Sequence, residues 1–229
     1  MPLIKIVPSL KKEKLALRLG QKRAGRMSYS SRQKIKKLNR RLEEILKPSL
    51  YFRSVPLHRV GKSYTELEDG TRFQSVKLSR TLKGCEEVVC FAATIGETVE
   101  TEISRLIEQN NLSEAYILDT MGSILAENMA ESFWQRMSSQ YKREGRGVSI
   151  RFSPGYCDWS ICEQEKLFRY IDTQKIPVTL TDSFLMSLRK SVSGVFGISH
   201  PHCAQDVSSY NPCDECRKVD CTEKRKRVA

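Results

Sequence analysis

The chain has 229 residues and a formal net charge of +12, because 39 lysines and arginines outnumber 27 acidic residues. That length can bury one sizeable core, so we expect one domain with appendages. The longest mostly apolar stretch, residues 88–95, is too short to span a membrane, and the charged N-terminal segment does not fit a secretory signal. These features argue against a membrane-spanning or secreted protein and predict a cytoplasmic one with reduced cysteines.

The positive charge is concentrated at the N-terminus. Residues 1–50 contain 15 lysines and arginines and 3 glutamates, whereas residues 51–229 contain 24 charges of each sign. A basic chain often indicates nucleic-acid binding. Because the body of this chain is neutral, its overall charge gives that function little support.

Residues 9–26 are rich in lysine, arginine and glycine with weak apolar spacing, which is typical of a flexible or marginally helical arm. Ser30 or Ser31 is a suitable N-cap for a helix that ends near Leu46, before a proline. Its apolar residues recur three or four positions apart, at Ile35, Leu38, Leu42 and Ile45. The simplest interpretation is an apolar stripe docked on the body with a solvated basic face. Recruitment of an acidic partner and contact with nucleic acid are the alternatives.

The rest of the chain mixes helices and strands without a regular alternation. Strands or extended pieces are expected at 51–60, 72–78, 87–94, 148–152 and 178–180, helices at 98–109, 113–141 and within 158–171, and a further apolar segment at 191–198. This mixture predicts an α+β fold with a mixed or antiparallel twisted sheet and flanking helices. No Gly-x-Gly-x-x-Gly loop occurs, which argues against a methyltransferase built on a nucleotide-binding sheet.

Three short motifs follow one another in the second half of the chain. They are Arg-Phe-Ser-Pro-Gly-Tyr at 151–156 (the hexapeptide), Leu-Thr-Asp-Ser-Phe at 180–184, and Ser-Val-Ser-Gly at 191–194 followed by Ser-His-Pro at 199–201. The guanidinium of Arg151 can pair bidentately with a carboxylate, and a Pro-Gly turn lets the backbone approach a ligand closely. By itself the hexapeptide fits a solvated arginine before an ordinary turn, but the ordered set indicates a binding site.

Together these motifs resemble the activation domain of cobalamin-dependent methionine synthase, over roughly residues 50–200. The resemblance implies that the protein binds S-adenosylmethionine (AdoMet) and supports the reductive methylation of cob(II)alamin. The cobalamin is then supplied by the partner, a cobalamin-dependent methionine synthase or another corrinoid protein, and an electron donor is a further partner. Catalysis is expected to be positioning, with no protein nucleophile or general base.

The resemblance also implies how AdoMet is held. Arg151 meets the ligand's carboxylate, and Glu127, in a Leu-Ala-Glu segment of the long helix, meets its amino group. The backbone of Ser153, Pro154 and Gly155 meets the adenine. Glu131 lies four residues after Glu127 on the same side of that helix and is the less favoured carboxylate.

The sequence leaves the roles of two aromatic residues open. Tyr156 ends the hexapeptide and either stacks on adenine or fills the core. Phe196 stands where the family has a tyrosine, so a ring is retained and a hydroxyl is lost. No secure counterpart is found for the acidic residue that the family places near the start of the domain.

Four cysteines near the C-terminus, Cys203, Cys213, Cys216 and Cys221, form the pattern C-x9-C-x2-C-x4-C. In a cytoplasmic protein this pattern favours an iron–sulfur cluster or a zinc ion over disulfides, with free thiols as the alternative. We hypothesise that such a cluster delivers the electron for reductive methylation. Cys85 and Cys90 are expected in the core, and Cys157 and Cys162 are candidates for a second metal or redox pair.

The expected organisation is a basic arm and helix at 1–47, an AdoMet-binding domain at 48–202 and a cysteine-rich, metal-binding tail at 203–229. Two other functions remain open. One is a non-catalytic AdoMet-binding or scaffold subunit. The other, less favoured, is a nucleic-acid-binding protein that uses the basic arm and a knuckle-like tail.

Overall fold

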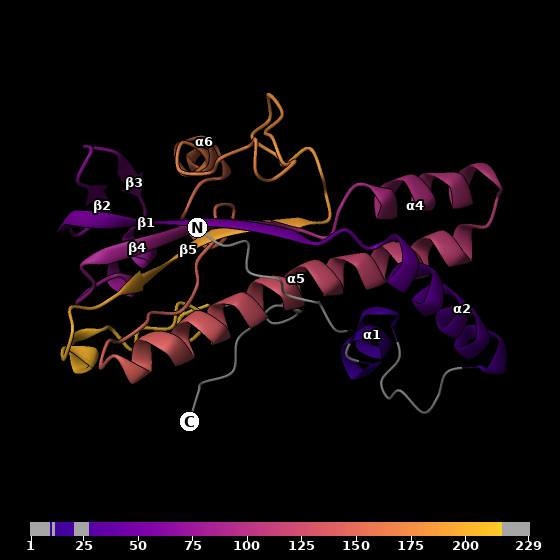
Figure 1. Cartoon of the computed structure of the whole chain (residues 1–229), viewed down its shortest axis with the longest axis horizontal. Coiled ribbons are helices and arrows are strands. Elements are labelled where there is room, and N and C mark those ends of the chain that lie inside the picture. The colour runs from indigo at the N-terminus through magenta and orange to yellow at the C-terminus, as the bar shows by residue number, and fades with distance from the viewer. Residues whose placement is uncertain (1–9, 11, 21–27, 217–229) are drawn as a thin grey trace.

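The computed structural model describes residues 10, 12–20 and 28–216, and its centre is a single antiparallel sheet (Figure 1). The strand order is β3-β2-β1-β4-β5. The strands are β1 (Ser49–Val60), β2 (Tyr64–Leu67), β3 (Arg72–Gln74), β4 (Glu87–Thr94) and β5 (Ser191–Ile198). All neighbouring pairs are antiparallel, and β1 is long enough to pair with β4 in its first part and β2 in its last. The predicted α+β fold with an antiparallel sheet is confirmed.

Helices cover both faces of this sheet. They are α1 (Lys12–Arg18), α2 (Tyr29–Ile45), α3 (Val76–Thr81), α4 (Thr98–Glu108), α5 (Leu112–Arg143) and α6 (Gln164–Phe168), with two short 3-10 helices at Ile161–Glu163 and Ala204–Asp206. Figure 1 shows α5 crossing one face and α6 lying over the other. Helices α1, α2 and α4 pack around α5 near its start.

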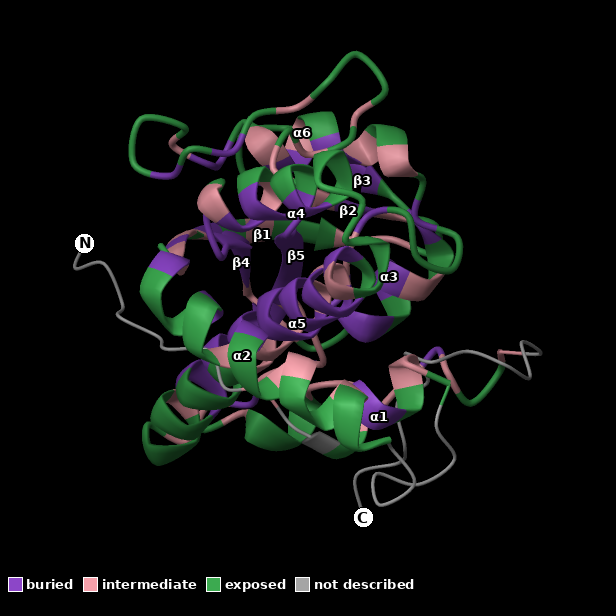
Figure 2. Cartoon of the chain, turned by 90° about the vertical axis from the view of Figure 1, so that its right-hand side faces the viewer, coloured by how far each residue is buried: buried purple, intermediate pink, exposed green. Residues whose placement is uncertain are grey.

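The main core lies between α5 and the sheet. Phe133 of α5 packs its ring 5.5 Å from that of Phe91 in β4 and 5.8 Å from that of Phe196 in β5. Each of these side chains is fully buried, and burial of such a ring contributes about 1.5–3 kcal/mol. Figure 2 shows the buried face of α5 at the centre of the molecule, against the sheet.

A second core on the opposite face holds the hexapeptide in place. Trp159 is fully buried, with its ring 5.4 Å from Phe73 and 6.0 Å from Phe152. The carbonyl of Trp159 accepts a hydrogen bond from the Gly155 N–H at 2.8 Å. The hexapeptide is therefore anchored to the sheet through an aromatic cluster.

Two predicted strands differ from the structure. Residues 76–78 begin helix α3 instead of continuing β3, because the Ser75 hydroxyl caps the Leu78 N–H at 2.9 Å. Residues 148–152 form only two isolated bridges to β5, Val148 to Ile198 and Phe152 to Val195. Between these bridges the Ser149 hydroxyl, not a backbone carbonyl, accepts the Gly197 N–H, so no continuous ladder forms.

The N-terminal region packs on the body more firmly than its composition predicts. Part of the arm that was expected to be flexible or marginally helical is helix α1, whose Leu15 is 1% exposed and belongs to the main core. Helix α2 begins after Ser28, and Ser28, not Ser30 or Ser31, is its N-cap. The predicted apolar stripe is confirmed, since Leu38 and Leu42 are buried in the same core. None of the helices among the described residues has the length and apolar character needed to cross a membrane.

Candidate functional site

The arginine of the hexapeptide is held by the two glutamates of α5. Arg151 Nη2 lies 2.9 Å from Glu127 Oε2, and Arg151 Nε lies 3.2 Å from Glu131 Oε2. The two carboxylates come from successive turns of one helix face. Burial would lower the pKa of Arg151, but the charges and hydrogen bonds of Glu127 and Glu131 outweigh it and raise that pKa. The structure thus brings together the two residues predicted to hold the two ends of an amino acid.

The hexapeptide bends at a glycine that no other residue replaces without strain. Gly155 has φ +85°, and a Cβ there would lie 3.3 Å from Ile161 Cδ1. A second glycine, Gly194, lies where the loop touches β5. A Cβ on Gly194 would come within 2.6 Å of the Phe152 carbonyl oxygen and 2.8 Å of Ser153 Oγ. The glycine of the third motif therefore makes room for the first.

The second and third motifs also meet, through a residue that the sequence did not single out. Gln164 is buried, donates from Nε2 to the Phe184 carbonyl at 2.7 Å, and accepts from the Ser193 hydroxyl at 2.8 Å. A single buried amide thus joins the end of Leu-Thr-Asp-Ser-Phe to Ser-Val-Ser-Gly. No local pattern marks a glutamine in a short helix for this role, because its partners are far away in sequence.

Two cavities beside the Arg151–Glu127 pair share Glu127 and Tyr156 as lining residues. The smaller, about 80 Å³, is lined by Glu127, Ile150, Arg151, Phe152, Ser153, Tyr156, Cys157, Pro212 and Cys213. The larger, about 590 Å³, is lined by Tyr156 and Glu127 again and by residues of α1, α5 and β5. Ligand pockets typically measure about 300–1,000 Å³. The larger cavity has that size, and the shared side chains connect it to the arginine.

The two aromatic predictions have different outcomes. Tyr156 is 50% exposed and lines both cavities, so it faces ligand space and does not fill the core. Phe196 is fully buried against Phe91 and Phe133 and lines neither cavity. The contact of Phe196 with a ligand stays a prediction, and the structure places this ring in the core rather than in a cavity wall. Residues alternate across a strand, and the neighbouring Val195 faces the hexapeptide side instead.

The cysteines fall into three separate places. Cys90 is buried in β4 and Cys85 packs under β5, and burial raises the pKa of Cys85 to about 12, as expected for core thiols. Cys203 follows β5 beside Asp206, whose hydrogen bond is the main cause of a raised pKa at that thiol. Cys213 instead lines the smaller cavity. Among the residues that the structure describes, no three His, Cys, Asp or Glu side chains are placed to hold a metal ion, and Cys221 lies outside them.

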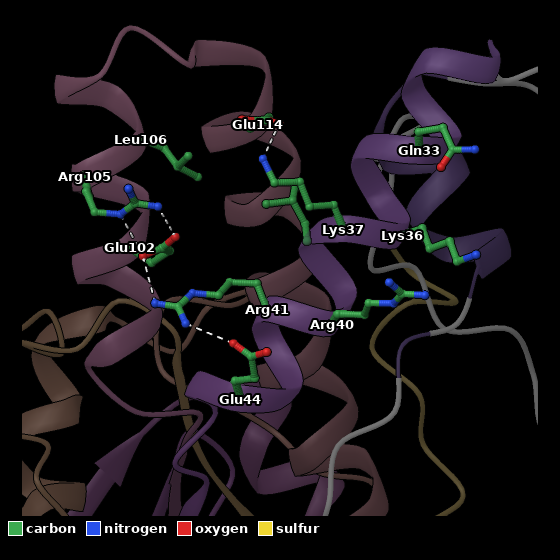
Figure 3. Close-up of a pocket in the computed structure, with 11 residues that line it drawn as sticks. Gln33, Lys36, Lys37, Arg40, Arg41, Glu44, Glu102, Arg105, Leu106 and Glu114 are labelled. Atoms are coloured by element: carbon green, nitrogen blue, oxygen red, sulfur yellow. Dashed lines mark hydrogen bonds and ion pairs between the residues drawn. The ribbon is translucent and has the colours of Figure 1, made fainter.

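A third hollow, about 790 Å³, lies between α2 and α4, at the basic face of α2 (Figure 3). Arg41 contacts Glu44 at 3.0 Å and Glu102 at 3.6 Å, and Lys37 contacts Glu114 at 3.6 Å. Lys37 and Arg41 of this basic face are thus paired with glutamates of the body, Glu114 and Glu102. These contacts favour the docked helix over the nucleic-acid alternative.

The Arg151–Glu127 ion pair and the two cavities that Glu127 and Tyr156 line belong to an α+β domain built on one antiparallel sheet. Residues 78–227 match the family model described as "Vitamin B12 dependent methionine synthase, activation domain", so the chain belongs to this family, as the three motifs predict.

The fold agrees with this assignment. A solved structure described as "Crystal Structure of the MetH Reactivation Domain bound to AdoHcy" is similar with a TM-score of 0.57 at 21% sequence identity. The similarity covers 75% of this chain and 66% of that one, so the chain spans slightly less than two thirds of its structural neighbour. No curated protein sequence matches the chain.

Proposed function

We propose that this protein binds AdoMet and supports the reactivation of a cobalamin-dependent methionine synthase or a related corrinoid protein. The observation that carries the proposal is the Arg151–Glu127 pair, at 2.9 Å, whose glutamate lines both cavities. Membership of the activation-domain family supports it, and so does the AdoHcy named for the similar solved structure. In this proposal the protein works in the cytoplasm, where its cysteines stay reduced.

The ion pair is arranged to open for a zwitterion. In the described structure Arg151 and Glu127 neutralise each other. When the amino-acid end of AdoMet enters, its carboxylate pairs with Arg151 and its ammonium with Glu127, so one ion pair is exchanged for two. Glu131, at 3.2 Å, keeps the guanidinium oriented while Glu127 turns to the ligand. Neither buried charge is left without a partner during the exchange.

The hexapeptide and Tyr156 then hold the rest of the ligand. The backbone of Ser153, Pro154 and Gly155 is fixed from behind by the Trp159 cluster, so it presents rigid main-chain groups to adenine. Tyr156 offers an exposed ring for stacking. Rigid positioning of the sulfonium methyl group is the chain's contribution to catalysis.

The partner supplies the corrinoid and a separate donor supplies one electron. A corrinoid reduced by that electron would accept the methyl group of AdoMet, and S-adenosylhomocysteine would remain on this chain. The carboxylate of Glu127 lies near the sulfonium in this arrangement and stabilises it in the bound state.

Calorimetry of AdoMet binding tests the proposal. Arg151→Ala removes a charged bidentate contact, so we expect affinity to fall by about 2–4 kcal/mol, or at least roughly tenfold. Arg169→Ala is the matched control, because Arg169 is exposed and lines neither cavity. Circular dichroism shows whether each variant is folded. A folded Arg151→Ala variant that binds AdoMet as tightly as the wild type contradicts the proposed site.

Turnover separates the enzyme-accessory role from a scaffold. A reactivation protein accelerates methylation of a reduced corrinoid partner, whereas a non-catalytic AdoMet-binding subunit binds the ligand without this effect. The informative assay measures the methylation rate of a methionine synthase that lacks its own activation domain, at a saturating concentration of AdoMet. Acceleration supports the first role, and tight binding without acceleration supports the second.

A further inference from the structure

A buried lysine stands behind the wall of the larger cavity and has no part in the function proposed above. Lys190 comes directly before β5 and is 6% exposed. Its Nζ lies 2.7 Å from Asp119 Oδ1 and 2.9 Å from the Ser123 hydroxyl. Both partners belong to α5, and both line the larger cavity. The buried ammonium is thus paired with groups that stand at the surface of a ligand-sized space.

The lysine is fixed in position from its backbone to its ammonium group. Its N–H donates to Glu100 Oε1 at 2.9 Å, and its carbonyl accepts from the Ile95 N–H at 3.2 Å. Its stem packs on α5 at Gly122, where a Cβ would lie 3.3 Å from Lys190 Cδ. Glycine is unfavourable within a helix, and at this point it makes room for the stem. Lys190 therefore presents a fixed donor to Asp119.

Asp119 keeps hydrogen-bonding capacity on its cavity side. Its side chain is 44% exposed, whereas that of Lys190 is 7% exposed. An ionised carboxylate can accept about four hydrogen bonds, and the lysine takes one of these sites. The ammonium also balances the charge of the carboxylate, so the pair as a whole is neutral. A neutral pair with acceptor sites left over suits uncharged donors such as hydroxyl groups better than a second cation.

The edge of the sheet supplies a second set of polar groups to the same cavity. β5 is the last strand of the sheet, and its first residues, Ser191 and Val192, line the cavity. Further along this edge, the N–H and the carbonyl of Val195 point outward and bond Phe152. Main-chain groups alternate along an antiparallel strand, so those of Ser191, four residues earlier, point to the same edge. These groups can both donate to and accept from a hydroxyl.

Asp119 and Glu127 lie on one face of α5 at a spacing that fits a nucleoside attached to an amino acid. They are eight residues apart, which is about 12 Å along a helix, and both line the larger cavity. In AdoMet eight covalent bonds separate the ammonium nitrogen from the ribose 3′ oxygen, about 9–10 Å when extended. A hydrogen bond of about 2.8 Å at each end covers the remaining distance. An ammonium held by Glu127 therefore brings the ribose within reach of Asp119.

We propose that Asp119 binds the vicinal hydroxyls of the ribose of AdoMet and that Lys190 positions it for this contact. The contact rests on the function proposed above, because it assigns one part of AdoMet to the larger cavity. Ribose carries two neighbouring hydroxyl groups, and one carboxylate can accept a hydrogen bond from each. The site therefore selects a ribonucleoside over a ligand that lacks these hydroxyls.

Calorimetry with AdoMet and with its 2′,3′-dideoxy analogue tests the contact. The analogue loses hydrogen bonds to a charged group, so the wild type should bind it at least about tenfold more weakly than AdoMet. Asp119→Asn should bind AdoMet more weakly than the wild type does and should lose most of the preference for AdoMet over the analogue. Asp172→Asn is the matched control and should keep the wild-type preference. Asp172 also pairs with a lysine, Lys175 at 3.0 Å, but lines neither cavity.

The possible outcomes separate this contact from the proposed function. A wild type that binds both ligands equally, or an Asp119→Asn variant that keeps the full preference, overturns the contact while the AdoMet site stands. Equal weakening of both ligands by Asp119→Asn means that Asp119 acts only through the fold, and this result also overturns the contact. A wild type that binds no AdoMet contradicts the proposed function itself, and the contact with it.

Lys190→Met tests the positioning role. Methionine keeps an apolar stem and removes the ammonium, so Asp119 stays ionised but is no longer held. We expect the preference for AdoMet over the analogue to fall, whereas a lysine that only supports the fold would lower Tm and leave the preference unchanged. Ser123→Ala removes the other partner of the ammonium and keeps both charges, so its preference should fall less. An unchanged preference in both variants overturns the role of Lys190.

Discussion

Replacement of Glu127 by glutamine distinguishes a ligand site from a structural ion pair. The change keeps the size of the side chain and removes its charge. In the free protein Arg151, 11% exposed, loses an ionic partner at 2.9 Å but keeps Glu131 at 3.2 Å. In the complex with AdoMet the ligand's ammonium loses its only proposed carboxylate.

The two effects have different sizes. A hydrogen bond to a charged group contributes about 1.5–3 kcal/mol to stability, and the remaining Glu131 reduces the loss to about 1 kcal/mol. For a chain of this length that lowers Tm by about 2–4 °C. Breaking a desolvated charge pair with a ligand costs about 2 kcal/mol or more, which is about 30-fold in affinity. We therefore expect a small change in stability and a large change in binding.

The assay combines thermal unfolding without ligand and calorimetry with AdoMet. Glu131→Gln is the matched control, since Glu131 contacts the same arginine but is 39% exposed. It should lower Tm by a similar amount and change the AdoMet affinity much less. If both variants lose stability and neither loses affinity, the glutamates only support Arg151, and the reasoning about the zwitterion is refuted.

Three further predictions concern the scaffold. Gly194→Ala should destabilise the protein and weaken AdoMet binding, measured by urea unfolding and calorimetry, because its Cβ would lie 2.6 Å from the Phe152 carbonyl oxygen. Leu42→Ala should lower the unfolding free energy by about 2–5 kcal/mol, because Leu42 is buried. Arg41→Ala, at an exposed ion pair, should lower it little. The reverse order would mean that charge, not apolar burial, holds α2 on the body. Unfolding free energy should fall as pH rises from about 9 to about 12, because burial raises the pKa of Cys85 to about 12 in the folded protein and only the unfolded thiol ionises in that range. The contribution of Cys85 is at most about 1.4 kcal/mol per pH unit. A Cys85→Ala variant with the same pH slope contradicts this.

The long periodic elements were predictable from the sequence. Helix α5 and strand β4 carry strong apolar patterns, and the structure has them at Leu112–Arg143 and Glu87–Thr94. The apolar stripe of α2 likewise indicated the face that docks on the body. In each case one face or one whole segment must leave water, and that requirement is visible in the local pattern.

Short elements were less predictable because long-range partners decide them. Helix α3 follows β3 at a point where the local pattern suggests a longer strand, and Asp158 accepts hydrogen bonds from its first N–H groups, at Val76 and Lys77. Helix α1 has weak apolar spacing, yet its Leu15 is buried in the main core, where α1 packs against α5. Neither partner is near in sequence, so local propensity could not reveal these elements.

The chemistry of the site was present in the sequence, and its geometry was not. The order of the three motifs indicated the family, and the resemblance to that family implied an arginine for the ligand's carboxylate and a glutamate for its amino group. Only the tertiary structure showed that Arg151 and Glu127 are in contact, that Phe196 faces the core, and that Cys157 lies with Cys213 while Cys203 does not. The physical reason is that side-chain identity sets which charges and ligands are possible, whereas the packing of α5, β5 and the tail decides which of them meet.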